Sequence, residues 1–169
     1  MIYELSVLQF SKMLKNLSAM LDKASEFAEM KKFDPGVLLQ SRLAPDQFNF
    51  TRQVQITCDT AKLCVASLAN KEAPVHPDEE VSIQDLKARI ESVISFLGKF
   101  SKDDFSGARD CKVTRPRWEG KHMSGPEFLV EHAVPNFYFH LTTAYSILRH
   151  NGVDLGKKNF LGELPYKKN

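Results

Sequence analysis

The feature that most constrains the fold is the spacing of apolar residues, which advance by three or four positions along long segments of the chain. This spacing places them on one face of an α-helix, because the helix has about 3.6 residues per turn. The first such stripe consists of Val7, Phe10, Leu14, Leu17, Leu21, Ala24 and Ala28. The pattern predicts a long helix over residues 2–30, which ends before the turn-forming residues Asp34, Pro35 and Gly36.

Two further segments repeat this pattern. The second helix is expected from about Pro45 to Ala69, with a stripe of Phe50, Val54, Ala61, Val65 and Leu68. The third begins at Ser82, with a stripe of Ile83, Leu86, Ile90, Val93, Leu97 and Phe100. Asp85 lies three residues after Ser82, which is the spacing of a helix-capping box. Both segments are therefore predicted to be amphipathic helices.

A fourth helix is expected from Ser124 to about Asn151. Glu127 supplies the capping partner of Ser124, and Gly152 stops the helix. Pro135 lies inside this segment and should kink the helix or start it afresh, because proline lacks the backbone N–H that a helix interior uses.

The segment between the third and fourth helices departs from the helical pattern. Residues 101–123 contain Gly107, Pro116 and Gly120. Val113, Arg115 and Arg117 alternate with other residues there, which is compatible with a small hairpin. We therefore expect a long loop or a small hairpin at this point.

Together these segments predict an all-α fold, an antiparallel four-helix bundle that forms one domain over residues 1–169. A chain of 169 residues fits a single domain. The tail after Val153 is expected to be irregular, with Phe160 and Leu161 packing back onto the bundle.

Charge and cysteine content narrow the class of protein. The net charge is only +2, from 23 basic and 21 acidic residues, which argues against a dedicated nucleic-acid binder. The odd set of Cys58, Cys64 and Cys111 is no disulfide framework, so reduced thiols in a cytoplasmic protein are expected. The first residues do not resemble a signal peptide, and no stretch of about 18 apolar residues suggests a membrane span.

The best candidate site lies on the fourth helix, where Asn136 and His140 stand one helical turn apart. The surrounding residues 135–150 are apolar or aromatic on nearly every side, which is typical of a buried helix. Buried polar groups need hydrogen-bond partners, which Gln53, Gln55 or Asp59 of the second helix could supply. We predict a pocket formed by these five residues and by Tyr145, whose hydroxyl could donate a proton although aromatic core filling is more common.

Three interpretations of His140 remain open. It could belong to a structural hydrogen-bond network, serve in a pocket as a metal ligand or acid–base group, or lie at the surface. A second, weaker candidate is the segment 114–118, where Arg115 and Arg117 flank Pro116 next to the single tryptophan, Trp118. It could bind an anion or a nucleic-acid base, but a solvated loop with Trp118 packed on the bundle is the favoured interpretation.

Several segments resemble a known family. They are residues 52–56 (RQVQI), 59–62 (DTAK), 135–140 (PNFYFH), 149–153 (RHNGV) and 159–162 (NFLG). In these segments the chain is similar, over essentially its whole length, to an uncharacterised bacterial and fungal domain-of-unknown-function family grouped with the DinB-like, or YfiT-like, helical bundles. The resemblance implies a four-helix bundle that is often dimeric, so a homodimer is expected.

The resemblance also raises the question of metal binding. Many DinB-like proteins hold a divalent metal with one histidine from the second helix and an HxxxH pair from the fourth. The spacing of His140, Arg149 and Gly152 matches the family pattern for the second histidine of that pair, whereas Asn136 stands in place of the first. Residues 48–60 contain no histidine. The triad is therefore degenerate, and we expect no zinc or nickel cofactor.

Two functions follow as hypotheses. The first is a ligand-binding or structural bundle with a polar pocket around Asn136 and His140, whose partner is a small molecule rather than a nucleic acid or a membrane. The alternative implied by the resemblance is a metal-assisted or thiol-dependent transferase or isomerase that uses His140.

Overall fold

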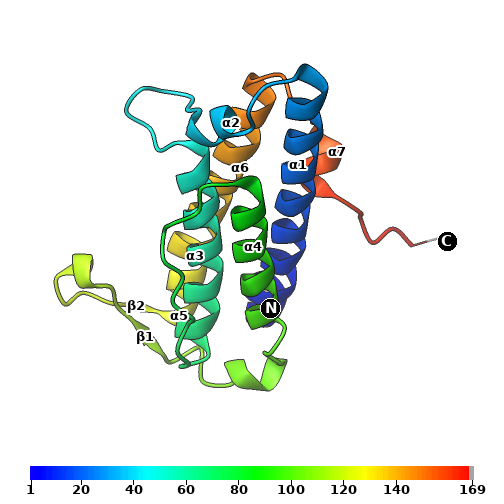
Figure 1. Cartoon of the computed structure of the whole chain (residues 1–169). Helices are drawn as coiled ribbons and strands as arrows, with labels where there is room; N and C mark the ends of the chain where they lie inside the picture. Colours follow the sequence, from blue (N-terminus) through cyan, green and yellow to red (C-terminus); the bar gives the residue numbers. More distant parts are fainter. Residues whose placement is uncertain (168–169) are drawn as a thin grey trace.

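Four long helices form the body of the protein, which the computed structural model describes over residues 1–167. They are α1 (Phe10–Lys31), α3 (Phe50–Leu68), α4 (Ile83–Leu97) and α6 (Val134–His150). A π-helical segment, Glu4–Gln9, leads directly into α1, so the first helical segment begins close to where the sequence predicts. The predicted all-α four-helix bundle is confirmed (Figure 1).

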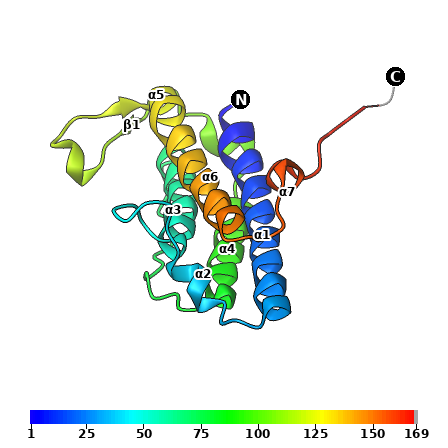
Figure 2. The same ribbon diagram turned by 90° about the horizontal axis from the view of Figure 1, so that it is seen from above.

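The order of the helices differs in one respect from a simple antiparallel bundle. Helices α3 and α4 run in the same direction, because residues 69–82 return along the length of the bundle between them (Figure 1). Helices α4 and α6 each pack against α1 and α3, and they lie at opposite corners of the bundle (Figure 2). The predicted antiparallel arrangement holds for α1 with α4 and for α3 with α6, whereas α1 and α6 also run in the same direction as each other (Figure 1). One long crossover connection is a common way to join such bundles.

Helix α3 begins five residues later than the sequence predicts. The short helix α2 (Gly36–Gln40) precedes it, and the N–H of Gln47 donates to the carbonyl of Ala44, 3.1 Å away, in a turn. The side-chain oxygen of Asn49 accepts a hydrogen bond of 3.0 Å from the N–H of Arg52 and so caps α3. The predicted start at Pro45 was wrong, because the asparagine provides the stronger N-cap.

The two predicted capping boxes are confirmed. The hydroxyl of Ser82 accepts from the N–H of Asp85 at 3.1 Å, and Asp85 accepts in return from the N–H of Ser82 at 2.9 Å. At the fourth helical segment, Glu127 accepts from the N–H of Ser124 at 2.9 Å. These contacts satisfy backbone donors that have no partner inside the helix.

The fourth helical segment has three parts. It opens with α5 (Gly125–Glu127), continues as a π-helical stretch, Phe128–Ala133, and becomes regular in α6. Pro135 is the second residue of α6, where the missing N–H of proline is tolerated. The backbone stays helical through Ala133, and the N–H of Val134 donates to the carbonyl of Leu129 in a π-type hydrogen bond. The expected restart at Pro135 was therefore wrong, because the π-helical stretch accommodates the proline inside a continuous helical segment.

The predicted hairpin between α4 and α6 is confirmed but small. Its strands are β1 (Lys112–Val113) and β2 (Met123–Ser124), which pair antiparallel with Val113 opposite Met123. A 3₁₀ turn, Pro116–Trp118, lies in the loop that joins them. A second 3₁₀ turn, Lys102–Phe105, precedes the hairpin, which projects outward from one end of the bundle (Figure 1).

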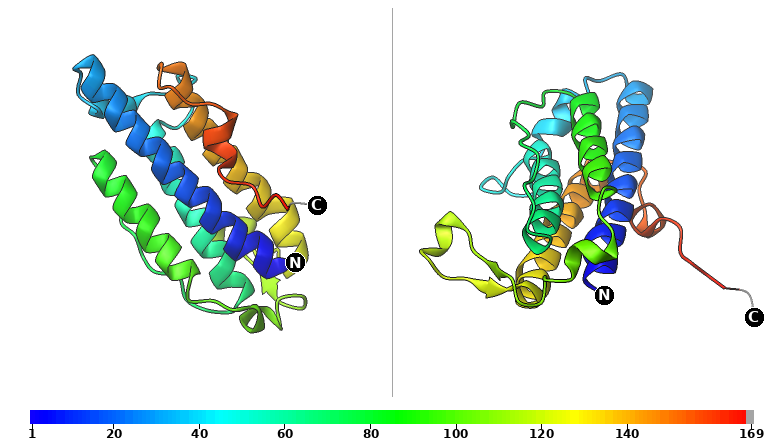
Figure 3. Two further views of the ribbon diagram at one scale, coloured as in Figure 1. Left: turned by 90° about the vertical axis from the view of Figure 1, so that its right-hand side faces the viewer. Right: turned by 90° about the horizontal axis from the view of Figure 1, so that it is seen from below.

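The tail is more regular than predicted, because it forms a short helix, α7 (Lys157–Leu161), against α1 (Figure 3). The side chain of Asn159 accepts from the N–H of Gly156 at 2.8 Å, which starts the helix. The ring of Phe160 packs at the edge of Tyr145, with the ring centroids 5.7 Å apart. The predicted packing of Phe160 onto the bundle is confirmed.

A single cluster of buried apolar side chains connects the four long helices. At its centre the rings of Phe10 and Phe137 stack with centroids 4.2 Å apart. Within residues 1–167, no helix is both long enough and apolar enough to cross a lipid bilayer.

Candidate functional site

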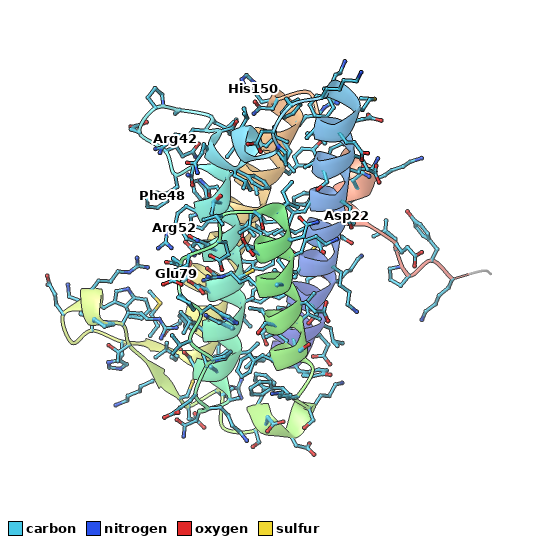
Figure 4. The ribbon with its side chains drawn as sticks, viewed as in Figure 1. Asp22, Arg42, Phe48, Arg52, Glu79 and His150 are labelled. Carbon is cyan, nitrogen blue, oxygen red and sulfur yellow. The ribbon has the colours of Figure 1, made fainter. Side chains whose placement is uncertain are left out.

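A groove of about 550 Å³ opens between α3, the fourth helical segment and the loop of the hairpin. Its lining combines apolar, cationic and polar side chains: Phe48, Arg52, Ile56, Asp59, Thr60, Leu63, Arg115, Pro116, Arg117, Phe128, His132, Asn136 and His140. Phe48 and Arg52 project from the same side of the bundle, away from α1 (Figure 4). Both principal residues of the predicted pocket, Asn136 and His140, therefore line one groove.

His140 lies at the bottom of the groove, and its orientation is fixed by Gln53. The imidazole Nδ1 is 2.7 Å from Oε1 of Gln53, and Nε2 of Gln53 donates to the carbonyl of Phe48 at 3.0 Å. Because the glutamine oxygen can only accept, Nδ1 of His140 carries the proton and Nε2 is left as an acceptor. Only 8% of His140 is exposed.

The environment of His140 keeps it uncharged. Burial and, to a smaller extent, the positive charge of Arg52 together lower the pKa of His140 to about 4. Its ordinary value would be 6.5. At neutral pH the groove therefore contains a neutral imidazole of a defined tautomer.

Asn136 is half-buried one turn before His140 on α6. Its Nδ2 donates to the hydroxyl of Thr60 at 2.8 Å, which joins α6 to α3. The hydrogen bond fixes the amide, so the side-chain oxygen of Asn136 remains available to the groove.

Asp59 lies at the edge of the groove but does not pair with His140. Its carboxylate accepts from Nη2 of Arg89 at 2.7 Å and from Nζ of Lys62 at 2.9 Å. Arg89 also contacts Asp78 and Glu80 of the crossover connection, at 3.1 Å and 2.8 Å. The charge of Asp59 is thus already balanced by two buried cations.

Gln55 and Tyr145 do not belong to the groove, which corrects our expectation for these two residues. Nε2 of Gln55 donates to Glu80 at 2.7 Å, so the side chain faces the crossover connection. Gln53 and Gln55 are two residues apart, and such residues point to different faces of a helix. Tyr145 packs against Phe160 near α7 instead.

Four cationic or titratable residues of the groove were not part of the predicted pocket: Arg52, Arg115, Arg117 and His132. His132 lies eight residues before His140, and the repeated spacing of four through Asn136 could have identified it. Arg115 and Arg117 reach the groove through their side chains, which contact Ser67 of α3 and His132 of the fourth helical segment. The favoured interpretation of residues 114–118 holds in the main, because Thr114, Pro116 and Arg117 are exposed and Trp118 is half-buried against Phe128 and His132. Only Arg115 departs from it, since its side chain is half-buried.

The residues of the groove do not fit the divalent metal that many DinB-like bundles hold. Across the described part of the chain, no three His, Cys, Asp or Glu side chains converge in a way that could hold a metal ion. Asn136 offers an amide where the family has imidazole, and three guanidinium groups line the same groove. Zinc and nickel prefer nitrogen and sulfur donors, and neighbouring positive charges disfavour any cation.

None of the three thiols lines the groove, and burial raises the pKa of the half-buried Cys111 as well as those of the other two. Cys58 and Cys64 are fully buried, and burial raises the pKa of each thiol to about 12. A thiol with such a pKa remains protonated at neutral pH and is therefore unreactive.

Comparison with known proteins identifies the family. Residues 2–161 match the family described as "Domain of unknown function (DUF1993)".

A crystal structure of a DinB family member protein from Shewanella denitrificans, at 1.83 Å resolution, superposes with a TM-score of 0.97. The two sequences are 57% identical, and the alignment covers 100% of this chain and 96% of that one. A comparison with curated proteins gives no match. The chain therefore belongs to the DUF1993 family of domains of unknown function, within the DinB-like superfamily.

Proposed function

We propose that this protein is a ligand-binding bundle whose groove between α3 and α6 takes a small molecule beside Asn136 and His140, without a resident metal. The observation that carries the proposal is the neutral, oriented His140 at the bottom of a groove of about 550 Å³. Pockets for small ligands have volumes of about 300–1,000 Å³ and combine an apolar lining with a few fixed polar groups. The hydrogen bonds to Gln53 and Thr60 hold both polar groups in place before a ligand arrives.

The test uses a neutral fluorescent probe, N-phenyl-1-naphthylamine, whose emission rises in apolar surroundings. We expect the wild-type protein to bind it and the Thr60→Phe variant to lose at least about tenfold in affinity, because the added ring fills the groove and one lost factor of ten corresponds to about 1.4 kcal/mol. Thr142→Phe is the matched control, since Thr142 is exposed on α6 and does not line the groove.

Equal binding by the wild-type protein and the Thr60→Phe variant would contradict the proposal, and so would the absence of binding to the wild type. Circular dichroism and the melting temperature of each variant show whether the fold is retained.

The competing function is a metal-assisted or thiol-dependent transferase or isomerase with His140 as the central group. One observation favours it: Nε2 of the neutral His140 is free to accept a proton or to bind a metal. The arginines and the missing histidine at position 136 argue against the metal-assisted form.

Metal analysis separates the two functions. We expect the purified protein to contain zinc and nickel well below one equivalent per chain, with no difference between wild type and His140→Ala. His150→Ala serves as the control, because His150 is exposed at the end of α6. Stoichiometric zinc or nickel that disappears only in His140→Ala would favour the metal-assisted enzyme instead.

A further inference from the structure

Two arginines of the groove have no acidic partner. Arg115 donates to the carbonyl of Thr114 and to the hydroxyl of Ser67, each at 3.1 Å, and its guanidinium lies 5.0 Å from the centroid of the Phe128 ring. Within residues 1–167, no carboxylate lies within 4 Å of its guanidinium nitrogens. Burial lowers the pKa of Arg115, and the charge of Arg117 acts in the same direction. A half-buried guanidinium usually has an ion-pair partner.

Among residues 1–167, Arg117 likewise has no acidic partner, although its side chain is exposed. Its Nη2 lies 3.1 Å from Nε2 of His132, to which it donates because guanidinium groups cannot accept. His132 then carries its proton on Nδ1, a buried atom with no partner in the described residues. Burial lowers the pKa of His132, and the charges of Arg117 and Arg115 lower it further. His132 is therefore neutral. The net charge at this end of the groove is that of the two arginines.

The other charged residues of the groove are balanced within the protein. Arg52 pairs with Asp78 of the crossover connection, and Asp59 pairs with Arg89 and Lys62. The uncompensated positive charge of the groove is consequently concentrated at one end, where the hairpin loop meets α3 and the fourth helical segment.

Apolar side chains of α3 and the preceding turn supply the other part of the lining. Phe48 and Leu63 are 54% and 41% exposed, which is high for large apolar residues that share a groove, and Ile56 is half-buried on the same helix. An apolar group that covers them would gain about 25 cal/mol for each Å² removed from water.

We propose that the ligand of this groove is an amphiphilic small molecule whose carboxylate or phosphate group binds between Arg115 and Arg117 and whose apolar body covers Phe48, Ile56 and Leu63. Arginine suits both oxyanions, because its fork of N–H donors matches two oxygens at once. This inference rests on the proposed function, since it concerns the same groove.

The experiment compares two probes with the same aromatic body. One is N-phenyl-1-naphthylamine, which is neutral, and the other is 8-anilinonaphthalene-1-sulfonate, whose sulfonate stands in for the oxyanion. We expect the sulfonate to bind about ten- to a hundredfold more tightly, and Arg115→Gln/Arg117→Gln to remove this advantage without weakening the neutral probe. Arg109→Gln/Arg149→Gln removes the same charge at two exposed positions outside the groove and should retain the advantage.

Displacement of the bound sulfonate probe by benzoate or by phenyl phosphate then distinguishes the two oxyanions. The compound that displaces the probe at the lower concentration carries the preferred head group. The single variant Arg117→Gln, which removes only the contact with His132, should lose part of the advantage even if Arg115 is needed for folding.

The inference is overturned if the two probes bind equally well to the wild type, or if the sulfonate keeps its advantage in Arg115→Gln/Arg117→Gln. Failure of the groove itself gives a different result, because the neutral probe would then not bind, or would bind Thr60→Phe as well as the wild type.

Discussion

Replacing Arg89 by alanine is expected to lower the free energy of unfolding by about 3 kcal/mol, near the lower end of the range for breaking a buried ion pair. The side chain of Arg89 is 1% exposed and contacts three carboxylates, those of Asp59, Asp78 and Glu80. Without the guanidinium, the carboxylate of Glu80, which is 10% exposed, loses a charged partner while it stays largely out of water. Asp59 and Asp78 are more exposed, and water offsets part of their loss.

The same ion pairs hold the crossover connection against α3 and α4. Asp78 and Glu80 lie in the connection, whereas Asp59 and Arg89 lie in the two parallel helices. His76 of the same connection also contacts both helices. Its Nδ1 is 2.8 Å from Nζ of Lys62, and its Nε2 is 2.9 Å from the hydroxyl of Ser92. We therefore expect Arg89→Ala to loosen this connection first, which hydrogen exchange of residues 71–82 would detect.

The effect of Arg89→Ala should depend on pH in a defined direction. Burial alone would raise the pKa of Glu80, but hydrogen bonds from Arg89 and Gln55 bring it below its ordinary value of 4.5. A carboxylate with a lowered pKa stabilises the folded state above the unfolded pKa and loses this contribution as the pH falls through the folded pKa. The difference in stability between wild type and variant should therefore be full at pH 7 and shrink below about pH 4.5.

Urea denaturation at several pH values measures this difference. Lys87→Ala is the control, because Lys87 on the same helix forms a more exposed ion pair with Asp22, worth only about 0–1 kcal/mol. An Arg89→Ala variant as stable as Lys87→Ala at pH 7 would contradict the role given to the network.

Phe137→Ala is expected to destabilise the protein by about 3–5 kcal/mol, the usual cost of truncating a fully buried phenylalanine. The ring is 0% exposed and stacks on Phe10, which joins α6 to α1 across the core. Truncation removes apolar contact area and leaves a cavity that the rigid helices cannot close. For a domain of this size the melting temperature should fall by roughly 6–20 °C.

Phe139→Ala provides a close control for this prediction. Phe139 is two residues further along α6 but is 57% exposed, so its loss should change the stability by only about 0.5 kcal/mol. Thermal melting followed by circular dichroism compares the two variants. Similar melting temperatures would show that the face of α6 that contains Phe137 does not form the core.

The fold could be predicted from the sequence because its determinants are local. The stripe from Val7 to Ala28 and the capping box of Ser82 with Asp85 each depend on residues within a few helical turns. The direction of α4 relative to α3 could not be predicted, because residues 69–82 are long enough either to turn at the end of α3 or to return along it, and the contact of Arg89 with Asp59 joins residues 30 positions apart.

The sequence could predict the residues of the site only where the helical period alone decides which side chains share a face. The helical spacing of Asn136 and His140 placed both on one face of α6. The polar residues of α3 then gave Gln53 as one of three candidate hydrogen-bond partners. The choice between Gln53 and Gln55 required the rotation of α3 relative to α6, which is a tertiary property. Arg115 and Arg117 are part of an irregular loop, and only the long-range contacts of their side chains with Ser67 and His132 bring them to the groove.

The most direct test of the account is the NMR spectrum of the His140 ring at pH 7, recorded with and without N-phenyl-1-naphthylamine and assigned with His140→Gln. The account predicts a neutral imidazole with its proton on Nδ1, whose signals shift when the probe is added to wild type but not when it is added to Thr60→Phe. A charged ring at pH 7, or a ring whose signals stay in place while the probe binds, would contradict a ligand site at His140.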